Sequence, residues 1–379
     1  MSTSVVLVGS GGYATNYVNM LLDNVLDMKL VGVVDPYASS SSAYDRFKDL
    51  VPIYNHMDEF YANHSAELAV VSTPIHLHFE QCMTALDNGS HVLCEKPLVP
   101  TVQQLDQLTA KAESVDKTLS VGFQWCYSPV MRKLKERIIA KEFGAPLHFK
   151  TFVSWPRDWA YYSRSSWAGV HKTADGKPVY DSVVSNATAH YIQNCLFLLG
   201  ASMEEAAELQ NVKHECFRAN DIETFDTIAL KAQANGINIF YAASHALNYK
   251  LNPMMDCRFE NARILANFFN QDWVVTIHHS DGRIEELQGE GDNNLAKMEC
   301  VEKSIKGLKP LDCSAKTVRP FTMLMDSIFT ELNVRKFENS CVVRDNEAKC
   351  TYVKNLHLDL WECFAQGKLP SEMEFLWSR

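Results

Sequence analysis

The 379-residue chain lacks several features that would place it in a specialised class of protein. None of its eleven cysteines form a Cys-x-x-Cys pair, which argues against zinc-ribbon and thioredoxin-like sites. The first residues lack the basic region and apolar core of a secretory signal, and no apolar run approaches the roughly 20 residues that a membrane helix needs. We therefore expect a cytoplasmic protein with reduced thiols and no membrane partner.

Basic residues are also outnumbered. The chain has 36 lysines and arginines against 46 aspartates and glutamates, a formal net charge of −10, and no basic run. Without a surface that tracks phosphates, nucleic acid is not an expected partner. The histidine pairs His76/His78 and His278/His279 have no acidic residue at a spacing that completes a ligand set, so we predict no metal site.

The length suits two domains, which we place at residues 1–125 and 126–379. The first domain alternates short apolar runs with amphipathic stretches, which predicts an α/β Rossmann fold with a doubly wound parallel sheet. Pro52 indicates either an edge position or a bulge for the third strand. The expected strands are Val5–Val8, Leu30–Val34, Val51–Tyr54, Leu68–Val71, His91–Cys94 and Leu119–Phe123, and the expected helices are Tyr13–Leu26, His76–Leu86 and one that Thr101 caps.

After Pro129 the pattern changes to longer β-rich runs, with Asn235-Gly236 as a hairpin signal. This predicts an α+β domain with a large open-faced, mostly antiparallel sheet that binds substrate and forms a homodimer or homotetramer. We expect the last helices to pack back on the first domain. The expected elements are a helix at Val130–Ala140, strands at Leu147–Val153, Phe225–Ala232, Ile237–His245 and Trp273–His278, and late helices near Phe321–Leu332 and Asp345–Phe364.

A glycine-rich turn follows the first expected strand. The residues are Gly9-Ser10-Gly11-Gly12-Tyr13-Ala14, the Gly-x-Gly-x-x-Gly/Ala fingerprint of dinucleotide binding in its required strand-to-helix context. Gly9 permits the tight turn, Gly11 lets the backbone approach a pyrophosphate, and Ala14 is small enough for helix and strand to pack. Gly12 and Tyr13 complete the loop, and the helix N-terminus offers free N–H groups to the anion.

An acidic residue ends the second expected strand. Asp35 lies 21 residues after Ala14, where a carboxylate accepts hydrogen bonds from ribose hydroxyls and repels a 2′-phosphate. No Arg or Lys occurs among Pro36–Ser42, so we predict NAD in preference to NADP. The alternative is that Asp35 starts a turn with Pro36.

Three further segments carry a resemblance to a known family. Thr73-Pro74 is followed by His78; residues 85–97 read Ala-Leu-x-x-Gly-x-His-Val-Leu-x-Glu-Lys-Pro; and Val121-Gly122 follows. Together with the glycine turn and Asp35, the pattern resembles the glucose–fructose oxidoreductase/inositol dehydrogenase (Gfo/Idh/MocA) family. The resemblance covers the first domain well and the second more loosely. It implies cofactor contacts from Ser72, Thr73, Pro74, His78, Glu95, Lys96 and Gln124.

The resemblance also implies the catalytic groups. Lys96 would lie beside the nicotinamide and the substrate hydroxyl, and His190 matches the histidine of an Asp-x-Gly-x-His-x-x-Asp helix in which both aspartates are replaced here, by Asn186 and Gln193. At helical spacing these three share one face. Burial beside a positively charged ring would favour the neutral amine, so Lys96 and His190 are the expected proton relay. The alternatives are a surface lysine and a helix histidine with structural partners.

The stretch from Trp155 to Trp167 is dense in aromatic residues and contains two arginines. Aromatic rings stack on sugars and arginine binds hydroxyls or carboxylates, so Tyr162 and Arg164 are candidate substrate contacts. A loop core or a subunit interface is the alternative.

These features predict an NAD-dependent dehydrogenase or reductase that acts on a hydroxyl carbon of a sugar, sugar acid or cyclitol. Two alternatives remain open at this stage. Some relatives cleave glycosides by transient oxidation and elimination with NAD, and the two amides at residues 186 and 193 keep that reading open. A non-catalytic NAD-binding regulator is the second alternative, because a fold does not fix a function.

Overall fold

The computed structural model describes residues 2–23, 26–268, 273–289 and 293–378. The chain divides into two compact units. The first unit comprises residues 1–127 and 293–322, and the second comprises residues 128–292 and 323–379. Among the described residues, no helix combines the length and apolar character that a membrane crossing requires. The sequence-based boundaries at 1–125 and 126–379 stay a prediction about independent domains.

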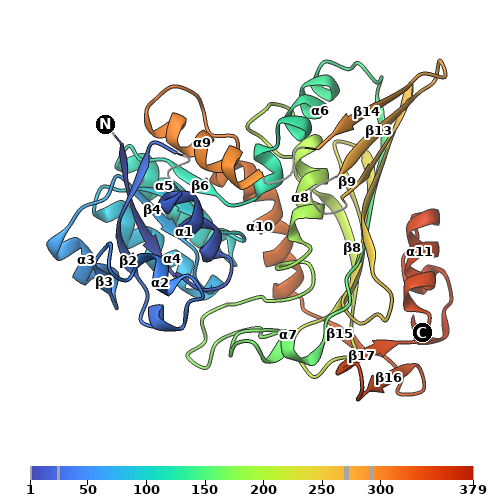
Figure 1. The fold of residues 1–379 in the computed structure, drawn as a ribbon. Coiled ribbons are helices and arrows are strands. Elements are labelled where there is room, and N and C mark those ends of the chain that lie inside the picture. Colours follow the sequence, from blue (N-terminus) through green and yellow to red (C-terminus); the bar gives the residue numbers. More distant parts are fainter. Residues whose placement is uncertain (1, 24–25, 269–272, 290–292, 379) are drawn as a thin grey trace. The chain divides into compact units, whose positions relative to one another are not determined.

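The first unit is built on a parallel sheet of six strands in the order β3-β2-β1-β4-β5-β6 (Figure 1). All of its pairings are parallel, which confirms the predicted Rossmann-type sheet. The strand order reverses between β1 and β4, the position at which open α/β sheets bind ligands. The strands are β1 (Thr3–Val8), β2 (Met28–Val34), β3 (Ile53–Tyr54), β4 (Leu68–Val71), β5 (His91–Cys94) and β6 (Leu119–Val121).

The first sheet owes its core to apolar strand residues that pack against helices. Val5, Leu30 and Val70 lie in one buried cluster with Tyr17 and Met298, so a helix from late in the chain completes this core. The helices are α1 (Ala14–Leu22), α2 (Tyr44–Phe47), α3 (Met57–Asn63), α4 (Ile75–Asp87), α5 (Val102–Ser114) and α9 (Asn293–Ile305), with short 3-10 turns at Ala38–Ser40 and at Gln124–Tyr127.

Several helix and strand boundaries in the first unit agree with those predicted from the sequence. β4 and β5 occupy the predicted residues, β3 lies at the sheet edge beside Pro52, and Thr101 accepts a hydrogen bond from the Gln104 backbone N–H as the cap of α5. The predicted helix Tyr13–Leu26 is too long, because α1 ends at Leu22, where the Asp23 N–H bonds the Asn19 carbonyl.

The second unit is built on a sheet of nine described strands in the order β14-β13-β12-β11-β7-β10-β9-β8-β15. Most pairings are antiparallel, as predicted; β7 with β10 and β8 with β15 are parallel. Asn235 and Gly236 both have positive φ, which confirms the hairpin between β9 and β10. The strands are β7 (Pro146–Ser154), β8 (Gln210–Arg218), β9 (Thr227–Ala234), β10 (Ile237–Ser244), β11 (Leu251–Phe259), β12 (Ala262–Asn267), β13 (Val274–His279), β14 (Ile284–Gln288) and β15 (Val334–Lys336).

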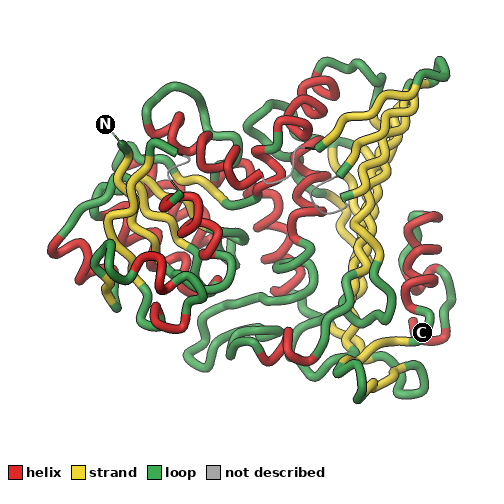
Figure 2. Tube along the Cα trace, viewed as in Figure 1, coloured by secondary structure: helices red, strands yellow, loops and turns green. Residues whose placement is uncertain are grey.

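Helices cover the two faces of this sheet unequally (Figure 2). α6 (Pro129–Ile139) and α8 (Ala189–Leu198) pack on one face, while α11 (Leu356–Gln366) covers part of the other face near β7 and β10. Phe152, Phe240, Leu360 and Phe364 belong to the apolar cluster under α11. No described helix covers the outer face of the strands at the β14 end.

The predicted helix Asp345–Phe364 is wrong in its first half. That segment begins with a hairpin of β16 (Val342–Asp345) and β17 (Cys350–Val353), and α11 starts only at Leu356. Thr351-Tyr352-Val353 favours a strand, and the left-handed Asn355 separates it from the helix. α10 (Ala315–Thr330) begins six residues before the predicted Phe321 and contains Pro320.

Candidate functional site

The glycine turn lies between β1 and α1 at the point where the strand order reverses. Gly9 has φ +84°, and a Cβ there would lie 2.5 Å from the Ser72 carbonyl oxygen and 2.8 Å from Thr73 Cγ2. Gly9 is therefore required both by its backbone angle and by the close approach of the loop that follows β4. At Gly11 and Gly12 a Cβ would meet nothing within 4 Å. The turn thus leaves open space in front of the α1 N-terminus, as a phosphate-binding loop requires.

Asp35 is held against this turn. Its Oδ2 accepts hydrogen bonds from the Ser10 N–H at 2.8 Å and the Ser10 hydroxyl at 2.7 Å, and its Oδ1 accepts one from the Tyr37 N–H at 2.8 Å. Asp35 can both stabilise the local turn and bind a ribose hydroxyl, because a carboxylate has about four acceptor positions and three are used. Asp35 fixes the loop and retains acceptor capacity.

Tyr13 brings two amide side chains to the mouth of the turn. Its phenol oxygen lies 2.5 Å from Asn294 Oδ1 and 3.2 Å from Gln124 Oε1. Gln124 was predicted from the family resemblance, whereas Asn294 on α9 was not. Both residues come from segments far from the glycine turn in sequence, so the first unit gathers polar groups around one loop.

A buried ion pair lies next to the predicted catalytic lysine. Glu95 Oε1 accepts hydrogen bonds from the Tyr17 hydroxyl at 2.5 Å and from Lys297 Nζ at 2.9 Å. The Lys297 side chain is fully buried and that of Glu95 is 10% exposed. Burial raises the pKa of Glu95, but Lys297 and Tyr17 together hold it below its ordinary value. Glu95 is therefore a carboxylate whose charge is balanced mainly by Lys297.

Gly122 makes room for this pair. A Cβ at Gly122 would lie 2.6 to 2.8 Å from the three carboxyl atoms of Glu95. Any side chain at this position would displace the Glu95 carboxylate. The Val121-Gly122 pair therefore has a local packing reason, independent of any cofactor.

Lys96 is the next residue after Glu95 in the chain, and the Lys96-Pro97 peptide bond is cis. The Lys96 N–H donates to Glu95 Oε2 at 3.2 Å. His78 ties this turn to the loop after β4, because its Nδ1 lies 3.0 Å from the Pro97 carbonyl oxygen and its Nε2 lies 2.8 Å from the Thr73 carbonyl oxygen. Burial lowers the pKa of His78 despite these carbonyl contacts. Ser72, Thr73 and Pro74 are thus fixed next to the turn that carries Lys96.

The remaining candidates lie in the second unit. Asn186 precedes α8, which begins at Ala189, so the expectation that residues 186, 190 and 193 share one helical face is wrong for Asn186. Its Nδ2 donates to Asp181 Oδ1 at 2.8 Å. His190 is half-buried on the first turn of α8, whereas Gln193 is fully buried.

Arg164 and Tyr162 lie at α7 (Trp159–Ser163), which Asp158 caps by accepting from the Tyr161 N–H at 2.9 Å. The Arg164 guanidinium stacks on the Tyr161 ring at 3.9 Å. Its Nη2 lies 3.9 Å from Asp181 Oδ2. Burial raises the pKa of Tyr162 well above its ordinary value, so its hydroxyl stays protonated. The structure therefore joins Asn186, Asp181 and Arg164 into one polar chain.

Sequence reasoning missed Tyr17, Asn294 and Lys297. Asn294 and Lys297 have helical i, i+3 spacing, which was the available signal for a shared face on α9. Within the described residues, no group of three or more His, Cys, Asp or Glu side chains is arranged to hold a metal ion.

Comparison with known proteins finds a family model that matches part of the first unit. A family model described as "Oxidoreductase family, NAD-binding Rossmann fold" (GFO_IDH_MocA) matches residues 3–123. Residues 3–123 are thus similar to the NAD-binding part of the Gfo/Idh/MocA family. The matched segment contains the whole six-stranded sheet, the glycine turn, Asp35 and Lys96.

Two curated relatives each match less than half of the chain. An uncharacterised oxidoreductase from Schizosaccharomyces pombe is 29% identical over 175 residues, which are 44% of this chain and 45% of that protein. The scyllo-inositol 2-dehydrogenase (NAD(+)) of Bacillus subtilis is 25% identical over 147 residues, 39% and 43% of the two chains. The chain thus spans about half the length of the curated relatives that it matches.

Solved structures extend the likeness in fold to most of the chain. A UDP-N-acetylglucosamine 3-dehydrogenase from Acidithiobacillus ferrooxidans has a TM-score of 0.70 at 18% identity, covering 87% of this chain and 97% of that chain. The WlbA dehydrogenase from Bordetella pertussis, solved with NADH and UDP-GlcNAcA, has a TM-score of 0.71 at 18% identity, covering 87% and 96%. At this identity the comparison establishes the shared fold.

Proposed function

We propose that the chain is an NAD-dependent oxidoreductase that transfers hydride between a hydroxyl carbon of a sugar, sugar acid or cyclitol and the nicotinamide. The observation that carries the proposal is the open glycine turn, with Asp35 hydrogen-bonded to it, at the switch point of a parallel sheet. Inositol and nucleotide-sugar dehydrogenases among the relatives and structural neighbours support the substrate class.

The first unit fits a dinucleotide. The backbone N–H groups at the start of α1 and the side-chain-free surface at Gly11 and Gly12 suit a pyrophosphate, and Asp35 suits a ribose diol. The nearest downstream arginine, Arg46, is paired with Asp23 at 2.5 Å, so it is engaged elsewhere. This arrangement favours NAD over NADP. When bound, the cofactor supplies the hydride acceptor.

The protein supplies the proton acceptor. In this proposal the Lys96 amine takes the hydroxyl proton as hydride leaves the same carbon, and His190 is the second candidate group for proton transfer. Glu95 interacts electrostatically with both Lys297 and Lys96, and Lys297 does more than Lys96 to lower the pKa of Glu95. Glu95 and Tyr17 position the Lys96 backbone rather than take part in the proton transfer.

The second unit supplies substrate contacts in this proposal. Asn186 and Arg164 are linked through Asp181, so they present donors in a fixed arrangement. Tyr162 offers a protonated hydroxyl. Gln193 is fully buried on α8 and cannot titrate, so its role in this proposal is to orient substrate or His190 by hydrogen bonds. Assembly as a homodimer or homotetramer, and a cytoplasmic location, remain predictions.

The test is a panel of sugars, sugar acids, cyclitols and their glycosides, incubated with the purified protein with and without added NAD. NADH that accumulates with one class of alcohol, and that Lys96→Met abolishes, supports the proposal. Lys29→Met, at an exposed position on β2, is the matched control and should keep activity. Correctly folded Lys96→Met protein with undiminished turnover would refute the role of Lys96.

The same panel separates the alternatives. Release of aglycone without NADH accumulation would identify a glycosidase that uses NAD transiently, and would overturn the net redox reaction. NAD binding without turnover of any class would favour a regulator. NADPH binding tighter than NADH would overturn the assignment of the cofactor.

A further inference from the structure

A row of basic side chains crosses the open face of the second sheet. Arg258 on β11 lies directly opposite Arg263 on β12, and Arg263 lies opposite His278 on β13. On the other side, Arg258 lies opposite His148 on β7. Residues directly opposite one another share a face with Cβ atoms about 5 Å apart, and like charges there are destabilising. We call these four residues, from four neighbouring strands, the basic row.

The charge of the basic row is only partly balanced. Arg263 makes a two-pronged pair with Asp256, at 3.0 Å from Nε and 2.8 Å from Nη2. Within the part of the chain that the structure describes, Arg258 and His278 have neither a hydrogen bond nor an ion pair from their side chains. Burial lowers the pKa of His148, and Lys150, Arg258 and Arg263 lower it further. Two guanidinium groups and one carboxylate leave a net positive charge.

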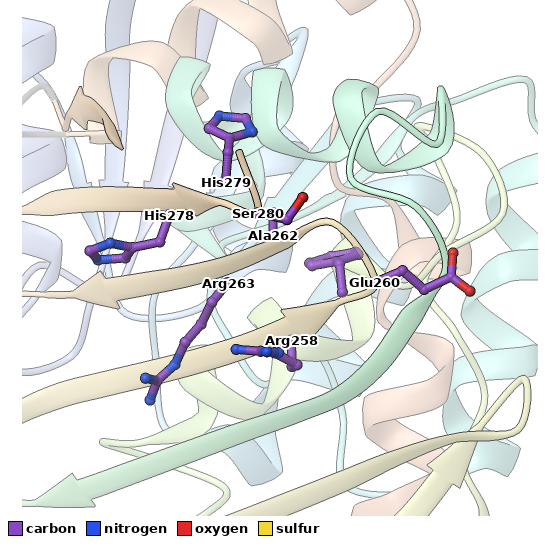
Figure 3. Close-up of a pocket in the computed structure, with 8 residues that line it drawn as sticks. Arg258, Glu260, Ala262, Arg263, His278, His279 and Ser280 are labelled. Carbon is purple, nitrogen blue, oxygen red and sulfur yellow. The ribbon is translucent and has the colours of Figure 1, made fainter. Parts of the chain in front are cut away.

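A hollow of about 370 Å³ lies beside this row (Figure 3). Arg258, Arg263 and His278 extend from one side of the strands, whereas His279 points to the opposite side, where it lies 3.6 Å from Glu285. The carboxylate in the lining, Glu260, points away from the arginines and accepts a hydrogen bond from the Ala145 N–H at 2.9 Å. Arg258, Arg263 and His278 therefore place cations and hydrogen-bond donors along one side of the hollow.

We propose that the basic row binds a small soluble anion that carries a phosphate group, such as a phosphate monoester. Arginine forks bind phosphate oxygens in pairs, and an imidazole adds a further donor. A bound phosphate would offset the repulsion between Arg258 and Arg263, which their opposite positions otherwise impose. The hollow is within the usual range of about 300–1,000 Å³ for small-molecule sites, so it has room for the group that carries the phosphate.

The test uses isothermal titration of the full chain with inorganic phosphate and with glucose 6-phosphate, and with glucose as the neutral control. Arg258→Gln should weaken phosphate binding about tenfold or more, since hydrogen bonds to a charged group are lost. Arg283→Gln removes the same charge from the nearby turn, where Arg283 is paired with Asp281 at 2.8 Å, and should leave binding within twofold. Circular dichroism checks that both variants fold.

A second variant should strengthen phosphate binding, which a misfolded protein would not do. Asp256→Asn removes the carboxylate that occupies Arg263, so phosphate should bind several-fold more tightly. Absence of phosphate binding to the wild type, or equal binding by the Arg258 and Arg283 variants, would overturn the proposal. It would also be overturned if Arg258→Glu shifted the oligomeric state in sedimentation while phosphate did not bind, because a second copy of the chain would then cover the row.

Discussion

Lys297 Nζ lies 2.9 Å from Glu95 Oε1, although the two residues are 202 positions apart in sequence. Both side chains are nearly or fully buried, and the Tyr17 hydroxyl completes the group. A buried charge left without its partner is costly, so this pair makes α9 an obligatory part of the first unit.

Removing Lys297 should therefore destabilise the protein strongly. We expect Lys297→Met to lower the free energy of unfolding by about 3–5 kcal/mol, since Glu95 would stay buried without its counter-ion. Urea denaturation measures the change. Lys303→Met, on the same helix but half-exposed, should cost less than about 1 kcal/mol. The double variant Lys297→Met/Glu95→Gln should recover part of the loss; an additive loss would contradict the pairing.

The glycine turn gives a second prediction. Gly9→Ala should both destabilise the protein and weaken NADH binding, because the new Cβ would lie 2.5 Å from the Ser72 carbonyl oxygen. Gly176→Ala is the matched control, since Gly176 has the same φ of +84° and a Cβ there would meet nothing within 4 Å. The control should cost only the left-handed strain of about 1–2 kcal/mol. Equal costs for the two variants, measured by thermal unfolding, would show that close approach is unimportant.

Asp35 gives a prediction about cofactor choice. Asp35→Asn should raise the ratio of NADPH to NADH affinity about tenfold, because the repulsion of a 2′-phosphate is removed while the side chain keeps its size. Fluorescence titration with both nucleotides measures the ratio. Asp49→Asn, at an exposed position, should leave it unchanged. If the Asp35 variant kept the wild-type ratio, Asp35 would have only its role in fixing Ser10.

His245 gives a prediction about pH. Burial, with Arg157 and Arg164 adding to it, lowers the pKa of His245 to about 3, while its Nδ1 lies 2.7 Å from the Trp155 carbonyl oxygen. Between about pH 6.5 and pH 3, His245 is therefore protonated in the unfolded chain and neutral in the folded chain. Stability from this group is complete above about pH 6.5 and falls by about 1.4 kcal/mol per pH unit below it, down to about pH 3.

The comparison that isolates this effect uses His245→Gln. Between pH 7 and pH 5 the wild type should lose about 2 kcal/mol more stability than this variant. His278→Gln, on the outer face of the sheet, should follow the wild-type curve. Parallel curves for wild type and His245→Gln would contradict the burial of a neutral imidazole.

The sequence predicted those parts of the fold that local pattern controls. β4 and β5 are short apolar runs bounded by turn residues, and both have the predicted ends. The Asn235-Gly236 hairpin followed from backbone preference alone. The segment Asp345–Phe364 was misread because its apolar residues satisfy strand and helix patterns alike, and the left-handed Asn355 that divides them has no strong local signal.

Side chains that pair across long sequence separations could not be predicted from local sequence patterns. Nothing near Glu95 in sequence indicates Lys297, and nothing near Tyr13 indicates Asn294. The amide at Asn186 could be read from the sequence, but its bond to Asp181 depends on a turn that replaces the first turn of the expected helix. Side chains that meet through tertiary packing are set by the whole fold.

The absence of a side chain at Gly122 is a requirement of the buried group formed by Glu95, Lys297 and Tyr17. Adding a single carbon there would push the Glu95 carboxylate aside, and Lys297 and Tyr17 would then lose a shared acceptor. Gly122 has no side chain, yet a substitution there would disturb the Glu95 carboxylate that accepts the Lys96 N–H. Loss of activity from a substitution at Gly122 should accordingly be traced to a displaced carboxylate before any direct effect on ligand is considered.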